Sequence, residues 1–288
     1  MIDLHCHSRA SDGLLAPAAL APAAVRAGLT ALALTDHDTT DGLAEFQAAA
    51  RGLPFEAVPG VEFSCSWYAG VMHLVGLFID PGAAELASLL KRIQLSRDDR
   101  NRRMVERLQQ LGVAIRWDSV AAQAGGAVIG RPHLARELVA LGVCKDLPDA
   151  FHRFLAVGKP AYVRRRLPLP EEVIAIVHRA GGVAVWAHPL GKLRHSPAHL
   201  RQTARVLKER GLDAIEARYA EFNDEDTAIA ERVAAQVKLL PSGGSDFHGE
   251  PGAGIALGTG RGGLAVPDAW LEPLRARAAE HARAQGGK

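Results

Sequence analysis

The chain has 288 residues, of which 48% are hydrophobic and 23% are charged, so extensive disorder and fibrous repeats are both excluded. The 34 basic and 32 acidic residues leave a net charge of +2, which is too small to indicate a general nucleic-acid binder or a membrane-surface protein. Twelve histidines against only 5% aromatic residues are unusual, and they direct attention to metal binding.

Short apolar runs alternate with amphipathic segments along most of the chain. The runs predict strands at Ile2–His5, Ala31–Thr35, Glu56–Phe63, Met72–Ile79, Val183–Ala187, Ala214–Ala217 and Lys238–Pro241. The segments predict helices at Ala16–Ala27, Leu43–Arg51, Pro170–Ala180, Leu200–Arg210 and Asp226–Ala235. This alternation favours a largely parallel sheet with helices outside it. We therefore expect an α/β fold with a distorted, seven-stranded relative of the (β/α)8 barrel.

One connection departs from the alternation. Glu62 and His73, near the end of the third strand and the start of the fourth, are only 11 residues apart. A parallel crossover needs about a dozen or more connecting residues, so the spacing predicts a hairpin. A hairpin would place His73 at the same rim of the barrel as Glu62.

A helical insertion follows the fourth strand. The chain has a mostly helical pattern from Ala83 to about Arg166, which predicts a barrel domain at 1–98 and 166–288 and a lid at 99–165. The insertion begins with a basic stretch, which is typical of a solvated helix face, although a groove for a polyanion is the alternative. Its cations are Lys91, Arg92, Arg97, Arg100, Arg102, Arg103 and Arg107.

Histidine and carboxylate side chains recur at the predicted strand ends. His5 and His7 are two residues apart on one strand, so both imidazoles point to the same side and Cys6 points to the other. Asp246 and His248 repeat this spacing after the last strand. The full set of candidate metal ligands is His5, His7, Asp12, His37, Glu62, His73, His188, Asp246 and His248.

The carboxyl ends of barrel strands meet at one rim, so these nine groups are expected to converge. Without a metal their convergence would be costly, because like charges and unsatisfied donors would be buried together. A donor set of imidazole and carboxylate suits Mn²⁺, Zn²⁺ or Fe²⁺. The alternative is a collection of unrelated capping residues and core histidines. Five other histidines lack paired ligands in the sequence and are expected to be structural or surface residues: His152, His178, His195, His199 and His281.

The two aspartates that flank His37 could orient the metal ligands from behind. For Asp38, capping of the next helix is an equal alternative.

The order of these motifs, HxH, SDG, TDHD, GVE, H, AHP and SDFH, resembles the polymerase and histidinol phosphatase (PHP) family of metal-dependent phosphoesterases. The runs Gly130-Arg131-Pro132-His133 and Pro160-Ala161-Tyr162-Val163 are similar to the bacterial branch that acts on nucleoside 3′,5′-bisphosphates and short RNA. The resemblance implies a barrel of PHP type and two to three divalent ions, with Mn²⁺ preferred. It assigns His5, His7, Glu62 and Asp246 to the first ion; Glu62, His73 and His188 to the second; and Asp12, His37 and His248 to the third.

The resemblance also implies a reaction. A metal-activated hydroxide would attack the 3′-phosphate of a nucleoside 3′,5′-bisphosphate, with Glu62 bridging the first two ions. Asp246 and His248 are the candidates for assisting proton transfer, and the acid for the leaving group is left open. The second phosphate of the substrate needs cationic contacts, for which Arg131 is the main candidate. Weaker candidates are His133, Lys159 and Arg218.

Three alternatives remain at this point. A 5′–3′ exonuclease on short oligonucleotides would use the basic insertion to guide the strand, and a histidinol-phosphate phosphatase would use the same metals. A non-catalytic PHP module is disfavoured, because every ligand position is filled. The three cysteines lack CxxC spacing, and neither a signal peptide nor an 18-residue apolar run is evident, so we expect a reduced cytoplasmic protein without membrane contact or an obligate protein partner.

Overall fold

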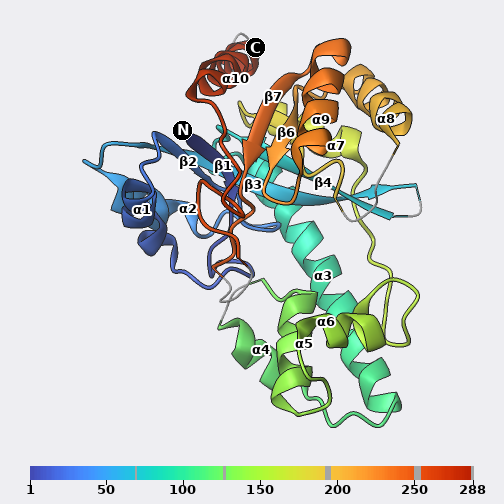
Figure 1. The fold of residues 1–288 in the computed structure, drawn as a ribbon. Coiled ribbons are helices and arrows are strands. Elements are labelled where there is room, and N and C mark those ends of the chain that lie inside the picture. The colour runs from blue at the N-terminus through green and yellow to red at the C-terminus, as the bar shows by residue number, and fades with distance from the viewer. Residues whose placement is uncertain (69, 126–127, 192–195, 250–253, 287–288) are drawn as a thin grey trace.

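The computed structural model describes residues 1–68, 70–125, 128–191, 196–249 and 254–286. Within this part of the chain, seven strands form one sheet in sequential order. They are β1 (Ile2–Cys6), β2 (Ala31–Leu34), β3 (Glu56–Trp67), β4 (Gly70–Leu77), β5 (Val183–Trp186), β6 (Ala214–Tyr219) and β7 (Leu240–Gly244). The sheet curls, with helices outside it (Figure 1). The chain after β7 hydrogen-bonds back to β1, with Asp246 N–H on the His5 carbonyl at 2.9 Å, so the barrel is nearly closed.

Strand direction confirms the predicted hairpin. β1, β2 and β3 are parallel to one another, as are β5, β6 and β7, whereas β4 is antiparallel to both β3 and β5. In the β3–β4 pairing, Glu62 is opposite Val75, and Ser64 is opposite His73. The reversal therefore brings His73 to the rim where the parallel strands end.

Two apolar layers follow the alternation of side chains along the strands. On β2, Leu32 and Leu34 point to an outer layer, whereas Ala31 and Ala33 point to the barrel interior. The surrounding helices are α1 (Pro17–Arg26), α2 (Leu43–Ala50), α7 (Pro170–Arg179), α8 (Pro197–Glu209), α9 (Asp224–Val237) and α10 (Leu271–Gly286). Helix α10 was not expected from the sequence; its Leu274 and Ala278 join the interior layer beside Ile2, at the end of the barrel where β1 begins.

Glycines allow the barrel to close. The sequence predicted the last strand at Lys238–Pro241, but β7 extends to Gly244, and Lys238 instead ends α9 in a left-handed conformation. A Cβ atom on Gly244 would collide with the Cβ atom of His5, and one on Gly243 would come within 2.5 Å of the Arg218 carbonyl oxygen. Only glycine permits these approaches of β7 to β1 and β6.

The helical insertion has its own apolar cluster. It contains α3 (Ala84–Gln110), α4 (Trp117–Ala124), α5 (Arg131–Ala140) and α6 (Leu147–Ala150), followed by a π-helical turn at Phe151–Leu155. Buried side chains between Met104 and Val163 pack with one another, and α3 connects this group to the barrel (Figure 1). The exact lid boundaries, 99–165, stay a prediction.

Solvation of the whole basic face of α3 was a wrong expectation. Arg97 and Arg100 are each only 7% exposed, because the chain around Arg165 and the start of α5 pack against this face. The three cysteines are buried and free. Among the described residues, the helices are too short or too polar to span a membrane.

Candidate metal centre

The structure brings all nine predicted ligands together at one rim of the barrel. His5 and Glu62 lie within β1 and β3, His73 lies in β4, and the others follow the ends of β1, β2, β5 and β7. Cys6 points away from the rim, and its Sγ lies 3.3 Å from the Ala33 carbonyl oxygen. His5 and His7 therefore point to the rim and Cys6 points to the other side, as the HxH spacing predicts.

A first group contains His5, His7 and Asp246. His5 Nε2 and His7 Nε2 are 3.2 Å apart, and Asp246 Oδ1 lies 3.0 Å from His7 Nε2 and 3.5 Å from His5 Nε2. Glu62 Oε2 lies 3.4 Å from His7 Nε2 and 3.5 Å from His5 Nε2. These four side chains could hold one ion.

A second group is built on the other oxygen of Glu62. Oε1 lies 2.8 Å from His73 Nδ1 and 3.0 Å from His188 Nε2, and the two imidazole nitrogens are 3.3 Å apart. Because Glu62 directs one oxygen to each group, its position is compatible with the bridging role that the family resemblance implies.

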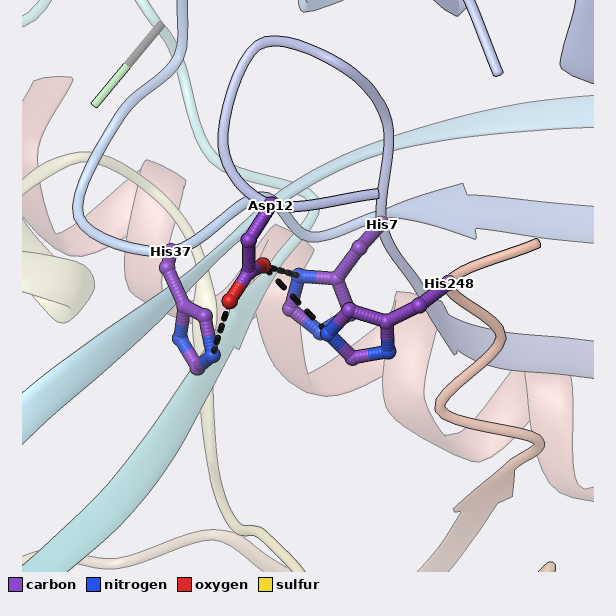
Figure 2. A group of neighbouring side chains, drawn as sticks. All are labelled: His7, Asp12, His37 and His248. Carbon is purple, nitrogen blue, oxygen red and sulfur yellow. Dashed lines mark ion pairs between the residues drawn. The ribbon is translucent and has the colours of Figure 1, made fainter. Parts of the chain in front are cut away.

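A third group surrounds Asp12 (Figure 2). Asp12 Oδ1 lies 3.3 Å from His248 Nε2, and Oδ2 lies 3.9 Å from His37 Nε2. His7 also belongs here, since its Nδ1 lies 4.0 Å from Asp12 Oδ1 and its ring stacks on that of His248 at 4.2 Å between centroids. His7 therefore has one nitrogen facing each of two groups.

Unsatisfied buried atoms show that these residues fit metal ions. Among the described residues, nothing hydrogen-bonds to three buried atoms of this set: His7 Nδ1, His37 Nδ1 and Glu62 Oε2. His37 Nδ1 lies 2.7 Å from Glu62 Oε2, yet the pair is not aligned as a hydrogen bond. An unsatisfied buried polar group costs about 1–3 kcal/mol, and more when it is charged. Coordination to a divalent ion would remove this cost, and the nitrogen and oxygen donors suit Mn²⁺, Zn²⁺ or Fe²⁺.

Nearby charges and burial keep Glu62 ionised and His7 neutral, which are the forms that bind a metal. Burial alone would raise the pKa of Glu62, but the charges of His37, His73 and His5 hold that pKa well below its ordinary value. Burial, together with the charge of His248, lowers the pKa of His7 to about 4. At neutral pH Glu62 is therefore ionised and His7 is neutral, as ligands must be.

Four other ligand histidines do not behave like His7: burial lowers the pKa of each, but neighbouring carboxylates outweigh burial and raise the pKa of His5, His37, His188 and His248. Burial lowers the pKa of His248, but the hydrogen bond to Asp12 and the charges of Asp246 and Asp12 outweigh burial and raise the pKa to about 10. Metal binding at His248 would therefore displace a proton.

Two residues of β6 that the sequence analysis missed support the ligands. Glu216 Oε1 accepts a hydrogen bond from His5 Nδ1 at 2.7 Å, and its Oε2 accepts one from the His188 backbone N–H at 2.5 Å. The Tyr219 hydroxyl donates to Asp246 Oδ2 at 2.8 Å. In the sequence, Glu216 is an acidic residue among the apolar residues at the start of β6, and this could have indicated a buried role.

The two aspartates beside His37, Asp36 and Asp38, contact different parts of the structure. Asp36 accepts hydrogen bonds from the Ser8 backbone and from the hydroxyls of Ser8 and Ser11, which holds the loop after β1. Asp38 is paired with Arg97 and Arg165. The alternative that Asp38 caps the next helix is wrong, because α2 begins at Leu43 with Gly42 as its N-cap.

Two ligand-bearing residues have left-handed backbone conformations. His188 has a φ of 32° and Asp246 a φ of 51°. Non-glycine residues rarely adopt this region, at a cost of about 1–3 kcal/mol each, and such residues cluster at functional sites. The strain at both positions directs ligand side chains into the rim.

The four residues predicted to bind substrate lie in different surroundings. Arg131 is half-buried at the start of α5, 3.5 Å from the Leu155 carbonyl oxygen and 5.7 Å from the Phe151 ring. His133 is buried, and its Nδ1 accepts the Gly130 backbone N–H at 2.9 Å. Lys159 is half-buried in the insertion. Arg218 is held by Glu231 at 2.8 Å and by the Ala265 carbonyl oxygen.

Two of the other histidines are partly buried, as expected, but they share a carboxylate that the sequence did not indicate. His178 Nε2 and His281 Nε2 contact the carboxylate of Asp213 at 2.7 Å and 3.0 Å, and their rings stack at 3.7 Å. The sequence could not show this, because the three residues come from α7, the start of β6 and α10. His195 lies outside the described residues.

Known proteins resemble this chain in sequence and structure. The PHP domain profile matches residues 3–116. A 3′,5′-nucleoside bisphosphate phosphatase from Chromobacterium violaceum is 39% identical over 88% of this chain and 88% of its own length. The 5′-3′ exoribonuclease Rnm from Salmonella typhimurium is 35% identical over 89% of this chain and 87% of its own. This chain belongs to the PHP family.

The structural comparison agrees with that assignment. A solved structure of an amidohydrolase from Chromobacterium violaceum superposes on this PHP protein with a TM-score of 0.86 and 35% identity, covering 96% of each chain. The PHP protein is a metal-dependent phosphoesterase, and its nine-residue rim provides the candidate metal sites.

Proposed function

We propose that the protein removes the 3′-phosphate from nucleoside 3′,5′-bisphosphates, such as adenosine 3′,5′-bisphosphate, and releases the 5′-monophosphate and phosphate. The observation that carries this proposal is a group of buried arginines without a matching number of carboxylates, which lies next to the candidate metal centre. A substrate with two phosphates needs a metal centre for the phosphate that reacts and a cationic group for the phosphate that is only bound. The 39% identical phosphatase supports the same substrate class.

The nine rim residues would hold the metals in the three groups described above. Divalent ions held there lower the pKa of water and offset the charge on phosphoryl oxygens. Glu62 would be shared between the first two groups. Asp246 and His248 are the side chains that we assign to proton transfer at the rim, and the Tyr219 hydroxyl fixes the orientation of Asp246.

Two hydrogen bonds connect the insertion, which carries the buried arginines, with the loop after β1 at the rim. Arg136 Nη2, on α5, lies 3.1 Å from the Asp12 carbonyl oxygen, and Val128 N–H donates to the Ala10 carbonyl at 3.3 Å. The middle of α5 and the segment before it therefore contact the loop that carries the candidate ligand Asp12. Free backbone N–H groups at a helix start attract anions.

Arg131 begins α5, and we assign it to the 5′-phosphate, which is not cleaved. Burial lowers its pKa, and the nearby charge of Arg97 adds to this effect, whereas Tyr162 opposes it. Arg100 is buried beside it, and its Nε has no hydrogen-bond partner in the described part of the chain. A bound phosphate would supply the missing charge and acceptors.

The remaining sequence candidates have lesser parts in this proposal. His133 is close enough to Asp12 for that charge to affect its pKa, which is lowered by burial and by Arg136. We retain it, with Lys159, as a secondary contact. Arg218 would have to leave Glu231 to reach a substrate, so it is the weakest candidate.

A 5′–3′ exoribonuclease is the second candidate, favoured by relatives with that name at 35% identity. Steady-state rates of Mn²⁺-loaded protein on adenosine 3′,5′-bisphosphate, a 5′-phosphorylated oligoribonucleotide and histidinol phosphate will discriminate the candidates. We expect the largest kcat/KM for the bisphosphate. A larger value for the oligoribonucleotide would establish the exoribonuclease, and one for histidinol phosphate would reject both nucleotide assignments.

A further inference from the structure

A cavity of about 550 Å³ lies between α3 and the segment that returns from the insertion to α7. Figure 1 shows this segment rising beside α3. The cavity is lined by Arg92, Ile93, Ser96, Asp99, Arg100 and Arg103 of α3, and by Arg164, Arg165, Arg166, Leu167, Pro168 and Glu172.

The charge of this lining is strongly unbalanced. The lining contains six arginines and two carboxylates, which gives a net charge of +4. Asp38 is not part of the lining but forms an ion pair with Arg165, and the net charge is +3 when Asp38 is included. A single phosphate group carries about −1.5 to −2 at neutral pH, so it would leave the lining cationic. Two linked phosphates match the charge better. The arginines also extend from Arg92 to Arg103, roughly 16 Å along the helix axis, which is longer than one phosphate.

One arginine of the lining is buried with an unsatisfied nitrogen. Arg100 is 7% exposed, and its Nε has no hydrogen-bond partner among the described residues. Burial lowers its pKa well below the ordinary value, as do the charges of Arg97 and Arg131. A buried cation without an anion is costly, and a bound anion removes that cost.

Contacts connect the cavity with the metal centre. Arg165 lines the cavity and also contacts Asp38 Oδ2 at 3.2 Å, and Asp38 directly follows His37. Arg100 lies near Arg131, which the proposed function assigns to the 5′-phosphate. One end of the cavity therefore lies next to the proposed position of the 5′-phosphate.

We propose that this cavity, called here the arginine cavity, receives the second phosphate of a 5′-diphosphorylated nucleotide. The inference rests on the proposed function and extends its substrate class from 5′-monophosphates to 5′-diphosphates. Arg100 and Arg165 border the first phosphate, and Arg103 and Arg166 contact the one beyond it.

Binding of products that lack a 3′-phosphate tests this inference without hydrolysis. We would measure the dissociation constants of adenosine 5′-diphosphate and adenosine 5′-monophosphate for Mn²⁺-loaded protein by calorimetry. The wild type should bind the diphosphate about tenfold more tightly. Arg103→Ala and Arg166→Ala remove exposed side chains, so folding should be retained, and each should remove most of this preference. Lys91→Ala removes an exposed cation of α3 outside the cavity and should keep it.

Each contrary outcome is distinct. Equal binding of the two nucleotides by the wild type would overturn the inference, as would equal weakening of both by Arg103→Ala. Inorganic pyrophosphate that binds the wild type as tightly as adenosine 5′-diphosphate would show an independent anion site and reject the substrate assignment. A protein that shows the diphosphate preference but does not hydrolyse adenosine 3′,5′-bisphosphate would retain the arginine cavity and refute the proposed reaction.

Discussion

The Glu216 carboxylate accepts a hydrogen bond from His5 Nδ1 at 2.7 Å, with both side chains fully buried. A carboxylate can only accept here, so Nδ1 of His5 carries a proton, and Nε2, which faces His7 and Asp246, is the nitrogen left to bind a metal. Glu216 also binds the His188 backbone N–H and so connects two of the metal groups. Carboxylates behind metal-binding histidines commonly fix the ring in this way.

We expect Glu216→Gln to weaken metal binding. The amide cannot accept hydrogen bonds from both His5 and His188 through its two terminal atoms, so His5 should lose its fixed tautomer. Loss of such supporting partners costs about 10–100-fold in metal affinity or activity. Calorimetric titration of demetallated protein with Mn²⁺ measures the change. Glu231→Gln, which affects only the contact with Arg218, is the control. Equal affinities in the two variants would show that Glu216 has no such role.

Removal of metal should abolish phosphatase activity, and Mn²⁺ should restore it. The reason is that three buried rim atoms, His7 Nδ1, His37 Nδ1 and Glu62 Oε2, have no hydrogen-bond partner among the described residues, and the nitrogen and oxygen donors around them suit divalent ions. The measurement is the rate on adenosine 3′,5′-bisphosphate before chelation, after chelation and after addition of Mn²⁺, with elemental analysis at each stage. Full activity in protein that contains no metal would refute the assignment of the rim.

Substitution of the ligands should act on catalysis, and substitution of a histidine at the other end of the barrel should not. Glu62→Ala and His5→Ala should each lower kcat/KM by more than about 100-fold, since loss of a supporting residue alone costs about 10–100-fold. His178→Ala loses the contact with Asp213 and the stacking on His281, both remote from the rim, and is the control. Rates are compared per folded protein, determined by circular dichroism. Similar losses in all three variants would place the site elsewhere.

Arg131→Ala should discriminate between substrates. Hydrogen bonds to charged groups contribute about 1.5–3 kcal/mol, so kcat/KM for adenosine 3′,5′-bisphosphate should fall about 10- to 150-fold. Adenosine 3′-monophosphate lacks the 5′ group, so it should be a poor substrate of the wild type and should lose much less in the variant. The two substrates and two proteins form a cycle. Equal losses would mean that Arg131 contacts the scissile phosphate or only stabilises the insertion.

Asp213 should stabilise the fold in a pH-dependent manner. Burial raises its pKa, but hydrogen bonds from His178 and the Ala184 backbone outweigh burial, so the folded pKa is lowered. A lowered folded pKa gives stability that is present above the unfolded value of about 3.9 and is lost as the pH falls through the folded pKa. Asp213→Asn should therefore reduce the free energy of unfolding by about 1–3 kcal/mol at pH 7.

The difference between wild type and Asp213→Asn should shrink towards pH 3, as urea unfolding at several pH values would show. Glu209→Gln, an exposed carboxylate at the end of α8, is the control and should change stability little at any pH. A difference that stays constant from pH 7 to pH 3 would mean that hydrogen bonding, and not the charge of Asp213, provides the stability.

The sequence by itself determined the β3–β4 hairpin, the meeting of nine histidines and carboxylates at one rim and, except for the shifted β7, the approximate positions of the strands. The reason is local: strand side chains alternate with a period of two, so His5 and His7 must share a side, and a connection as short as that between Glu62 and His73 excludes a parallel crossover. The ends of parallel strands must also meet at one rim, which predicts convergence without coordinates.

Only the tertiary structure decided which partners hold those residues. Glu216 supports His5 from 211 positions away in the chain, and Asp38 pairs with Arg97 and Arg165 across the junction with the insertion. Such pairs have no periodicity or motif, because they depend on how separate elements pack. The same holds for Arg100: its basic sequence context is typical of a solvated helix, and only the packing of the returning segment shows that it is buried.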